Sequence, residues 1–163
     1  MTLFLSSDMK SVELNNIICF EKIKNNIMNN SYFYKLIYSD EFCSFNGIFF
    51  IFKMKNIKIE KYFNKLKCNI SNLQHNLNQI KNICLIEEKI LHKFKEILHG
   101  YTYKFRIKEQ LKNMNIKLQN NENYKYTNYD NLTFLLKISG IWSSSDKKET
   151  GLTFKFFIVN KSV

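Results

Sequence analysis

Leu132–Trp142 (LTFLLKISGIW) and Leu152–Val159 (LTFKFFIV) are the two stretches that decide the fold. Both are rich in β-branched and aromatic residues, which suit the pleated surface of a sheet. The polar segment Ser143–Thr150 lies between them and ends at Gly151, as a hairpin loop would. We therefore expect these two stretches to form adjacent antiparallel strands.

Other strands are expected on both sides of the middle of the chain. Ser31–Ser39 (SYFYKLIYS) and Gly47–Lys55 (GIFFIFKMK) have the same aromatic and β-branched composition. Tyr101–Lys108 alternates aromatic or aliphatic residues with polar ones, which predicts a strand with one solvated face. Asn56–Phe63 also alternates, and it fits either a strand or a short helix.

The middle of the chain changes period. From about Asn72 to Leu98, apolar residues recur at intervals of three and four, which predicts one long amphipathic helix. Ser71 is the expected N-cap, and Gly100 is the expected stop. Strands, a long helix and strands again indicate a single α+β domain over residues 1–163, with a mostly antiparallel sheet or small barrel.

Charge and aromatic content together indicate the class of ligand. The chain has 25 Lys and Arg residues against 14 Asp and Glu, a formal net charge of +11, and 15% aromatic residues. Lysine neutralises phosphates, and aromatic rings stack on unpaired bases. Arg106 is the only arginine, so the cations suit sequence-tolerant contacts with a backbone better than readout of base edges. Because AT-rich genes overproduce Lys, Asn and Ile, coding bias is an alternative source of part of the charge.

Cations that lie within aromatic strands are the first binding candidates. These are Lys35 with its neighbour Tyr34, Lys53, Lys104, Arg106 and Lys108. In the expected strand, Lys104, Arg106 and Lys108 share one face and could follow a phosphate backbone or form an ordinary solvated surface. Lys35 and Lys53 keep one side of their strands near water, so rings on that side are candidates for stacking or for the core.

Aromatic residues outside the expected strands form a second group of candidates. Tyr124, Lys125 and Tyr126 lie in an Asn-rich polar segment with no evident core to enter, which favours stacking on bases. Trp142 ends its strand before the polar loop, a position equally suited to capping the core and to stacking.

The sequence argues against catalysis. It contains no glycine-rich phosphate loop, no H-E-x-x-H and no G-x-S-x-G. We therefore expect no catalytic residues and no cofactor, and we keep as an alternative a nucleic-acid enzyme whose carboxylates converge only in the folded chain.

The cysteines and the apolar runs bear on location. The four cysteines form no C-x-x-C pair, and the three histidines lie in the central helical stretch, so we expect free thiols in a reducing compartment and no metal site. No apolar run approaches the roughly 18 residues that span a bilayer. The first residues lack the basic and apolar regions of a secretion signal, so the expected location is cytoplasmic.

Leu135–Phe156 (LLKISGIWSSSDKKETGLTFKF) resembles the C-terminal signature of single-strand-binding proteins of large cytoplasmic DNA viruses and yeast cytoplasmic linear plasmids. The matching residues are Lys137, Ser139, Gly140, Ile141 and Trp142 before the loop, and Gly151, Leu152, Thr153, Phe154 and Lys155 after it. Asn16–Phe20 resembles an early strand of these proteins more loosely. The basic loop that follows usually contains Pro and Gly, and residues 21–30 of this chain contain neither.

The resemblance implies an OB-like, mostly antiparallel β-barrel that binds single-stranded DNA during replication outside the nucleus. It also adds Lys137 and Lys155 to the nucleic-acid-binding candidates. RNA as the ligand, replication proteins as partners and association of several copies all stay open. The alternative function is that of a structural or assembly protein, which binds an acidic partner or packages nucleic acid without catalysis.

Overall fold

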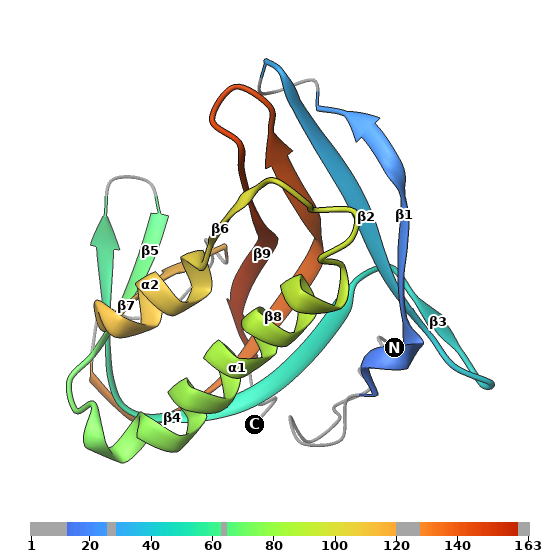
Figure 1. Ribbon diagram of the computed structural model, residues 1–163. Coiled ribbons are helices and arrows are strands. Elements are labelled where there is room, and N and C mark those ends of the chain that lie inside the picture. The colour runs from blue at the N-terminus through green and yellow to red at the C-terminus, as the bar shows by residue number, and fades with distance from the viewer. Residues whose placement is uncertain (1–12, 26–28, 63–64, 120–127, 160–163) are drawn as a thin grey trace.

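The computed structural model describes residues 13–25, 29–62, 65–119 and 128–159, and Figure 1 shows the arrangement of their helices and strands. The strands are β1 Ile17–Lys24, β2 Ser31–Ser39, β3 Ser44–Phe45, β4 Ile48–Tyr62, β5 Lys65–Ile70, β6 Thr102–Lys104, β7 Asn115–Leu118, β8 Asn128–Ser144 and β9 Glu149–Ile158. The helices are α1 Leu77–Lys93 and α2 Arg106–Lys112, with 3-10 turns at Leu14–Asn16 and Gln74–Asn76.

The long strand β8 lies in the middle of the sheet and has partner strands along both of its edges. Along one edge it pairs antiparallel with β9, from Phe134 to Ser144, which confirms the hairpin expected from the sequence. Along its other edge it pairs first with β4 and then, from Gly140 onward, with β2. Two strands from the first third of the chain therefore lie side by side with the C-terminal hairpin.

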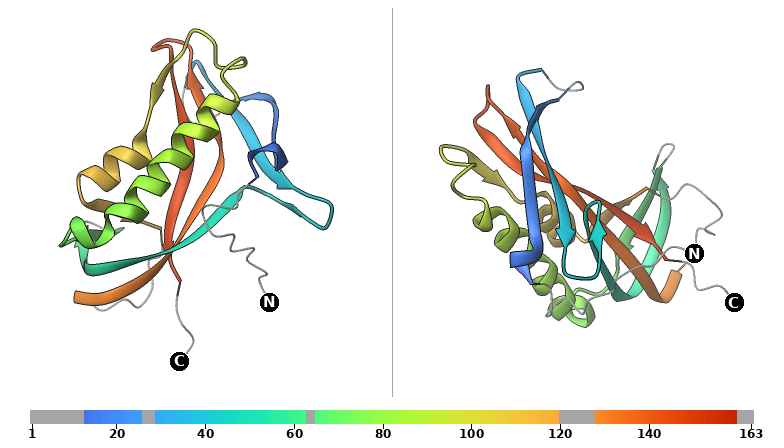
Figure 2. Two further views of the ribbon diagram at one scale, coloured as in Figure 1. Left: turned by 60° about the horizontal axis from the view of Figure 1, so that its bottom comes forward. Right: turned by 90° about the vertical axis from the view of Figure 1, so that its right-hand side faces the viewer.

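Five strands close into a barrel in the order β4-β5-β7-β9-β8, with β8 returning to β4. All pairs in this ring are antiparallel except β7 with β9, which meet in parallel. This closed mixed barrel with one long helix is consistent with an OB-like α+β fold. Figures 1 and 2 show β1 and β2 extending beyond the barrel, and β3 joins them by pairing with β2.

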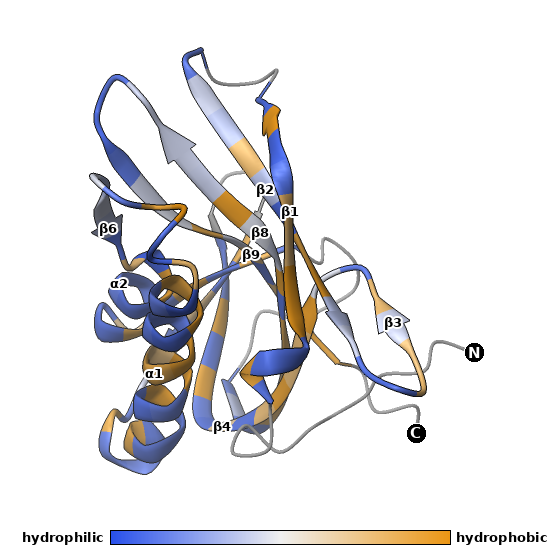
Figure 3. Ribbon diagram, turned by 45° about the vertical axis from the view of Figure 1, so that its right-hand side comes forward, coloured by the Kyte–Doolittle hydropathy of each residue, from blue (hydrophilic) through white to orange (hydrophobic). Residues whose placement is uncertain are grey.

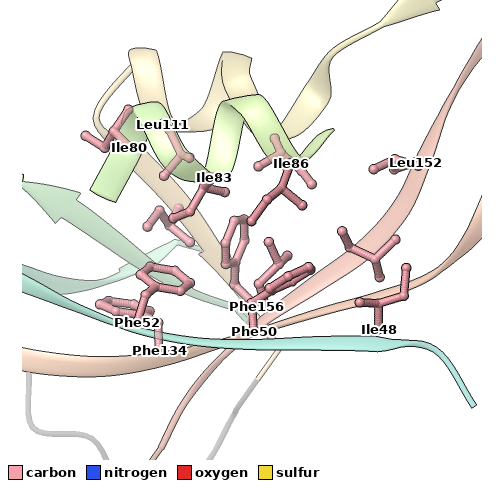
Figure 4. Close-up of a cluster of buried hydrophobic side chains, with 14 of the residues drawn as sticks. Ile48, Phe50, Phe52, Ile80, Ile83, Ile86, Leu111, Phe134, Leu152 and Phe156 are labelled. Atoms are coloured by element: carbon pink, nitrogen blue, oxygen red, sulfur yellow. The ribbon is translucent and has the colours of Figure 1, made fainter. Parts of the chain in front are cut away.

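Alternate residues of the strands fill the core between the barrel and the helices. On β4, Phe50 and Phe52 point toward α1, where they meet Phe156 of β9 (Figure 4). The Phe52 ring stacks on Phe134 with 5.5 Å between ring centroids. Isoleucines at helical spacing on α1, among them Ile83, cover these rings from the other side. The opposite face of β4 and β8 therefore points away from the helices.

The segment Tyr101–Lys108 is not one strand, which corrects the expectation from its alternating pattern. β6 ends at Lys104, and α2 begins at Arg106. Ile107 and Leu111 are fully buried at the i and i+4 positions of α2, so the helix buries an apolar stripe that the strand could not.

A buried carboxylate joins α1 to the first turn of α2. The two oxygens of Glu87 accept hydrogen bonds from the backbone N–H groups of Ile107, at 3.0 Å, and Lys108, at 2.8 Å. These N–H groups have no partner within α2 itself because they lie in its first turn. Burial raises the pKa of Glu87 to about 7, although the two N–H bonds act in the opposite direction.

The central helix is shorter than expected. α1 begins at Leu77 after a 3-10 turn, and its N-cap is Asn76 rather than Ser71. The Asn76 side chain is buried and bonds both the N–H and the carbonyl of Lys55 on β4. That contact ties the start of the helix to the strand at a point where β4 bends, because Asn56 has a φ of +54°.

Candidate nucleic-acid interface

The face of the sheet that points away from α1 carries the strongest concentration of cations and rings. We call it the lysine–phenylalanine face. It comprises Phe20 on β1, Phe33 and Lys35 on β2, Phe49 and Lys53 on β4, Lys137 on β8, and Lys155 and Phe157 on β9. All eight side chains are exposed or half-buried, whereas their neighbours along β2, β4 and β8 lie in the core.

Lys137 lies at the centre of this face. Its Cα partner on β4 is Phe49, and its Cα partner on β9 is Lys155. The Lys137 ammonium lies 5.3 Å from the centroid of the Phe49 ring, a cation–π distance. Two residues before Lys137 on β8, Leu135 pairs with Ile51 on one side and with Phe157 on the other. An apolar row therefore borders the central cations.

The face continues onto the extension formed by β1 and β2. Lys35 pairs with Gly140, and its ammonium lies 6.0 Å from the centroid of the Phe20 ring, which is 50% exposed. The Phe33 ring covers the Cα of Gly140, where a Cβ atom would come within 2.3 Å of it. Figure 3 shows that β1, the edge strand, carries apolar segments on both sides of a hydrophilic middle.

The electrostatics of this face are unbalanced. Lys137 and Lys155 sit directly opposite each other, and like charges in that position destabilise a sheet. The described positions of this face on β2, β4, β8 and β9, residues 33–37, 49–55, 131–140 and 153–157, contain no acidic side chain, and on β1 Glu21 follows Phe20. The repulsion between the two lysines is therefore not offset within the face, which favours an anionic ligand.

A second pair of opposed lysines differs from the first because an acidic side chain lies beside it. Lys67 on β5 and Lys117 on β7 are also direct partners, but Glu60 on β4 lies opposite Lys67. The Glu60 carboxylate bonds Asn69 and lies 2.8 Å from the Lys58 ammonium. Hydrogen bonds from Lys58 and Asn69, together with the nearby lysine charges, lower the pKa of Glu60. There, an acid within the protein balances the cations.

Three predicted cations do not form a line, because their segment folds as β6 and α2. Lys104 pairs with Glu149 at 3.0 Å, and Lys108 pairs with Glu88 at 2.6 Å. Arg106 stacks instead on Trp142, with 4.6 Å from its guanidinium carbon to the ring centroid. The expectation that the three would follow one phosphate backbone from a single strand face is therefore wrong.

Two of the aromatic candidates are largely buried and not exposed at the surface. Tyr34 is only 9% exposed and belongs to the core, which corrects its proposed role in stacking. Trp142 is also 9% exposed, and Arg106 covers its ring, so the position favours capping over stacking. The segment Tyr124–Tyr126, with Lys125, lies outside the described residues.

Sequence reasoning kept rings that share a side with Lys53, such as Phe49, as candidates for stacking or for the core, but it named none of the four phenylalanines of the face as site residues. The signal that could have identified them was parity: Phe33 shares the side of β2 that Lys35 keeps near water, and Phe49 shares that of Lys53 on β4. Phe157 has the same relation to Lys155. Phe20 had no such signal, because β1 has an irregular register between Cys19 and Lys22.

The described residues also bear on other chemistry. They contain no group of three or more His, Cys, Asp or Glu side chains placed to hold a metal ion. No helix among them is long and apolar enough to cross a membrane. The four cysteines are free thiols, and burial raises the pKa of Cys68 to about 12 and that of Cys19 to about 11.

Comparison with known proteins adds no assignment. No protein-family model, no curated protein and no solved structure matches this chain. The candidate interface therefore rests on the fold and on the chemistry of its side chains.

Proposed function

We propose that this protein binds single-stranded DNA, without strong sequence preference and without catalysis, through the lysine–phenylalanine face. The single observation that carries the proposal is the opposed pair Lys137 and Lys155, which has no acid among residues 131–140 and 153–157 of its own two strands and is bordered by half-buried rings. The lysines would neutralise phosphates, and the rings would stack on unpaired bases. The resemblance of the C-terminal hairpin favours DNA and a role in protecting or organising it during extranuclear replication.

The rings distinguish single strands from duplexes. In a duplex the base faces are stacked on one another, so Phe49 and its neighbours could contact only phosphates, sugars and groove edges. In a single strand the same rings can stack on bases, each for about 1–3 kcal/mol. The proposal therefore predicts a strong preference for single strands, whereas an assembly protein that uses charge alone would bind both forms comparably.

We expect tight binding of a fluorescein-labelled oligo-dT of 30 nucleotides, with much weaker binding of a matched duplex. The logarithm of affinity should fall with the logarithm of salt concentration, with a slope of about −0.7 for each neutralised phosphate. Fluorescence anisotropy at several salt concentrations, repeated with oligo-U, would measure the slope and the preference between DNA and RNA.

Variants then test whether this face is the site. Lys137→Ala combined with Lys155→Ala should weaken oligo-dT binding at least about tenfold and reduce the salt slope, because phosphate contacts are removed. The matched control is Lys117→Ala, an exposed lysine on β7 outside the face. Equal losses from the double variant and the control, or equal affinity for duplex and single strand, would contradict the proposal.

A further inference from the structure

We infer that the bound strand runs along β8, from the level of Lys53 to the level of Lys35, and that about four or five nucleotides contact the protein. This inference rests on the proposed function and gives the path and length of the ligand on the same site. It comes from the order in which cations and rings occur along one edge of β8.

Along the edge of β8 that faces β4 and β2, cationic and aromatic side chains occur in turn. Along that edge, Lys53 pairs with Thr133, Phe49 pairs with Lys137, and Lys35 pairs with Gly140. At a rise of about 3.4 Å per residue, the first two levels are separated by about 14 Å. The last two are separated by about 7 Å, because β8 has a bulge between Ile138 and Gly140 and β9 covers the same step with two residues, from Lys155 to Thr153. The edge thus carries a cation, then a ring beside a cation, then a cation, over a total of about 21 Å.

The spacing of these groups matches an extended single strand. Successive phosphates of such a strand lie at most about 6–7 Å apart, so about 21 Å holds four or five of them. Phe49 lies between the end cations, and Phe20 and Phe33 flank Lys35. Lysine ammonium groups already lie over Phe49 and Phe20, at 5.3 and 6.0 Å, so a phosphate and a base can engage neighbouring groups at each level.

A path across the strands uses the face less fully. At the level of Lys137 it would meet Phe49 on one side and Lys155 on the other within about 10 Å, the width of two strand spacings. That length holds about two nucleotides. It also leaves Lys35 and Lys53 without a role, although both are exposed.

The test is a set of single variants measured with a short ligand. Lys53→Ala and Lys35→Ala should each weaken binding of dT6 on the order of fivefold and lower the salt slope, since each removes a phosphate contact. The off-face control Lys117→Ala should change the affinity no more than about twofold, and Lys155→Ala should weaken binding no more than Lys35→Ala or Lys53→Ala does. With the unaltered protein, affinity should rise steeply up to dT5 and only gradually from dT5 to dT12.

The outcomes separate this inference from the proposed function. If Lys155→Ala weakens dT6 binding while Lys35→Ala and Lys53→Ala do not, the strand crosses β8 and the inferred path is wrong. A steep rise in affinity that continues well beyond dT6 overturns the inferred length. If the unaltered protein fails to prefer dT30 over duplex, the proposed function itself fails. Circular dichroism of each variant checks that the fold is retained.

Discussion

Replacing Gly140 with alanine should lower the free energy of unfolding by on the order of 3 kcal/mol. An alanine Cβ at this position would come within 2.3 Å of the Phe33 ring and 2.4 Å of the backbone oxygen of Tyr34. The ring could swing away, but the oxygen belongs to β2, which pairs with β8 at this point. The substitution therefore forces the two strands apart.

Thermal and urea unfolding would measure this loss. The control is Gly100→Ala, where no heavy atom lies within 4 Å of the added Cβ and only the positive φ of +82° opposes the substitution. That strain costs about 1 kcal/mol. Adding Phe33→Ala to Gly140→Ala should recover only part of the loss, because the Tyr34 oxygen still clashes. A Gly140→Ala protein as stable as the unaltered one would show that β2 does not approach β8 this closely.

This substitution bears on binding as well as stability. Gly140 lets Phe33 lie flat against β8, beside Lys35 on the lysine–phenylalanine face. Displacing Phe33 would alter the end of the lysine–phenylalanine face at Lys35. Any Gly140→Ala protein that still folds should therefore also bind oligo-dT more weakly. Gly140, one of the residues on which the resemblance of the C-terminal hairpin rests, thus has a structural reason that depends on Phe33 and Tyr34 of β2.

The parts of the fold that could be predicted are those with strong local signals. β2 spans Ser31–Ser39, the range expected from composition, and β8 and β9 extend the predicted hairpin by a few residues. Their signals were strong because one side of each strand is buried over several alternating positions. The helical period of α1 was equally clear, and only its ends were misplaced.

The parts that could not be predicted depend on contacts between distant segments. β5 and β7 were missed, since each is short and pairs with strands whose position the sequence does not reveal. In Tyr101–Lys108, the alternation of apolar and polar residues fits a strand, but from Arg106 onward the chain folds as α2. Glu87, about 20 residues earlier, decides the choice because its carboxylate accepts the first N–H groups of α2.

The candidate site was also predicted only in part: four of its lysines were expected, but most of the strand contacts that bring them together were not. Lys35, Lys53, Lys137 and Lys155 lie on one face, although they come from four different strands. The polar loop predicted that the strands of Lys137 and Lys155 are neighbours, but no local signal placed the strands of Lys35 and Lys53 beside them. Tyr34 was misassigned because it alternates with Lys35 and so points to the opposite side of β2. The charge of each strand and the pairing of β8 with β9 could be predicted, but the positions of β2 and β4 beside β8 could not.

The stability of the protein should fall as pH rises from about 4.5 to about 7, in part because of Glu87. The folded-state pKa of this carboxyl is raised to about 7 by burial, compared with 4.5 for an exposed glutamate. Between these values the folded protein holds a proton that the unfolded chain releases, so folding is favoured at the acidic end. The full difference is on the order of 2–3 kcal/mol, and it is reached above pH 7.

The variant Glu87→Gln isolates this contribution because glutamine does not titrate. Glutamine has an NH2 donor where the second oxygen of Glu87 faces a backbone N–H group of Ile107 or Lys108, so the variant should be less stable than the unaltered protein at pH 5. That gap should narrow by on the order of 2 kcal/mol at pH 8, where the unaltered protein bears the cost of a buried charge. Urea unfolding of both proteins at the two pH values measures the change, and other titrating groups cancel in the comparison. A gap that widens with pH would mean that the two N–H bonds outweigh burial and that Glu87 is ionised throughout, as an N-terminal partner of α2.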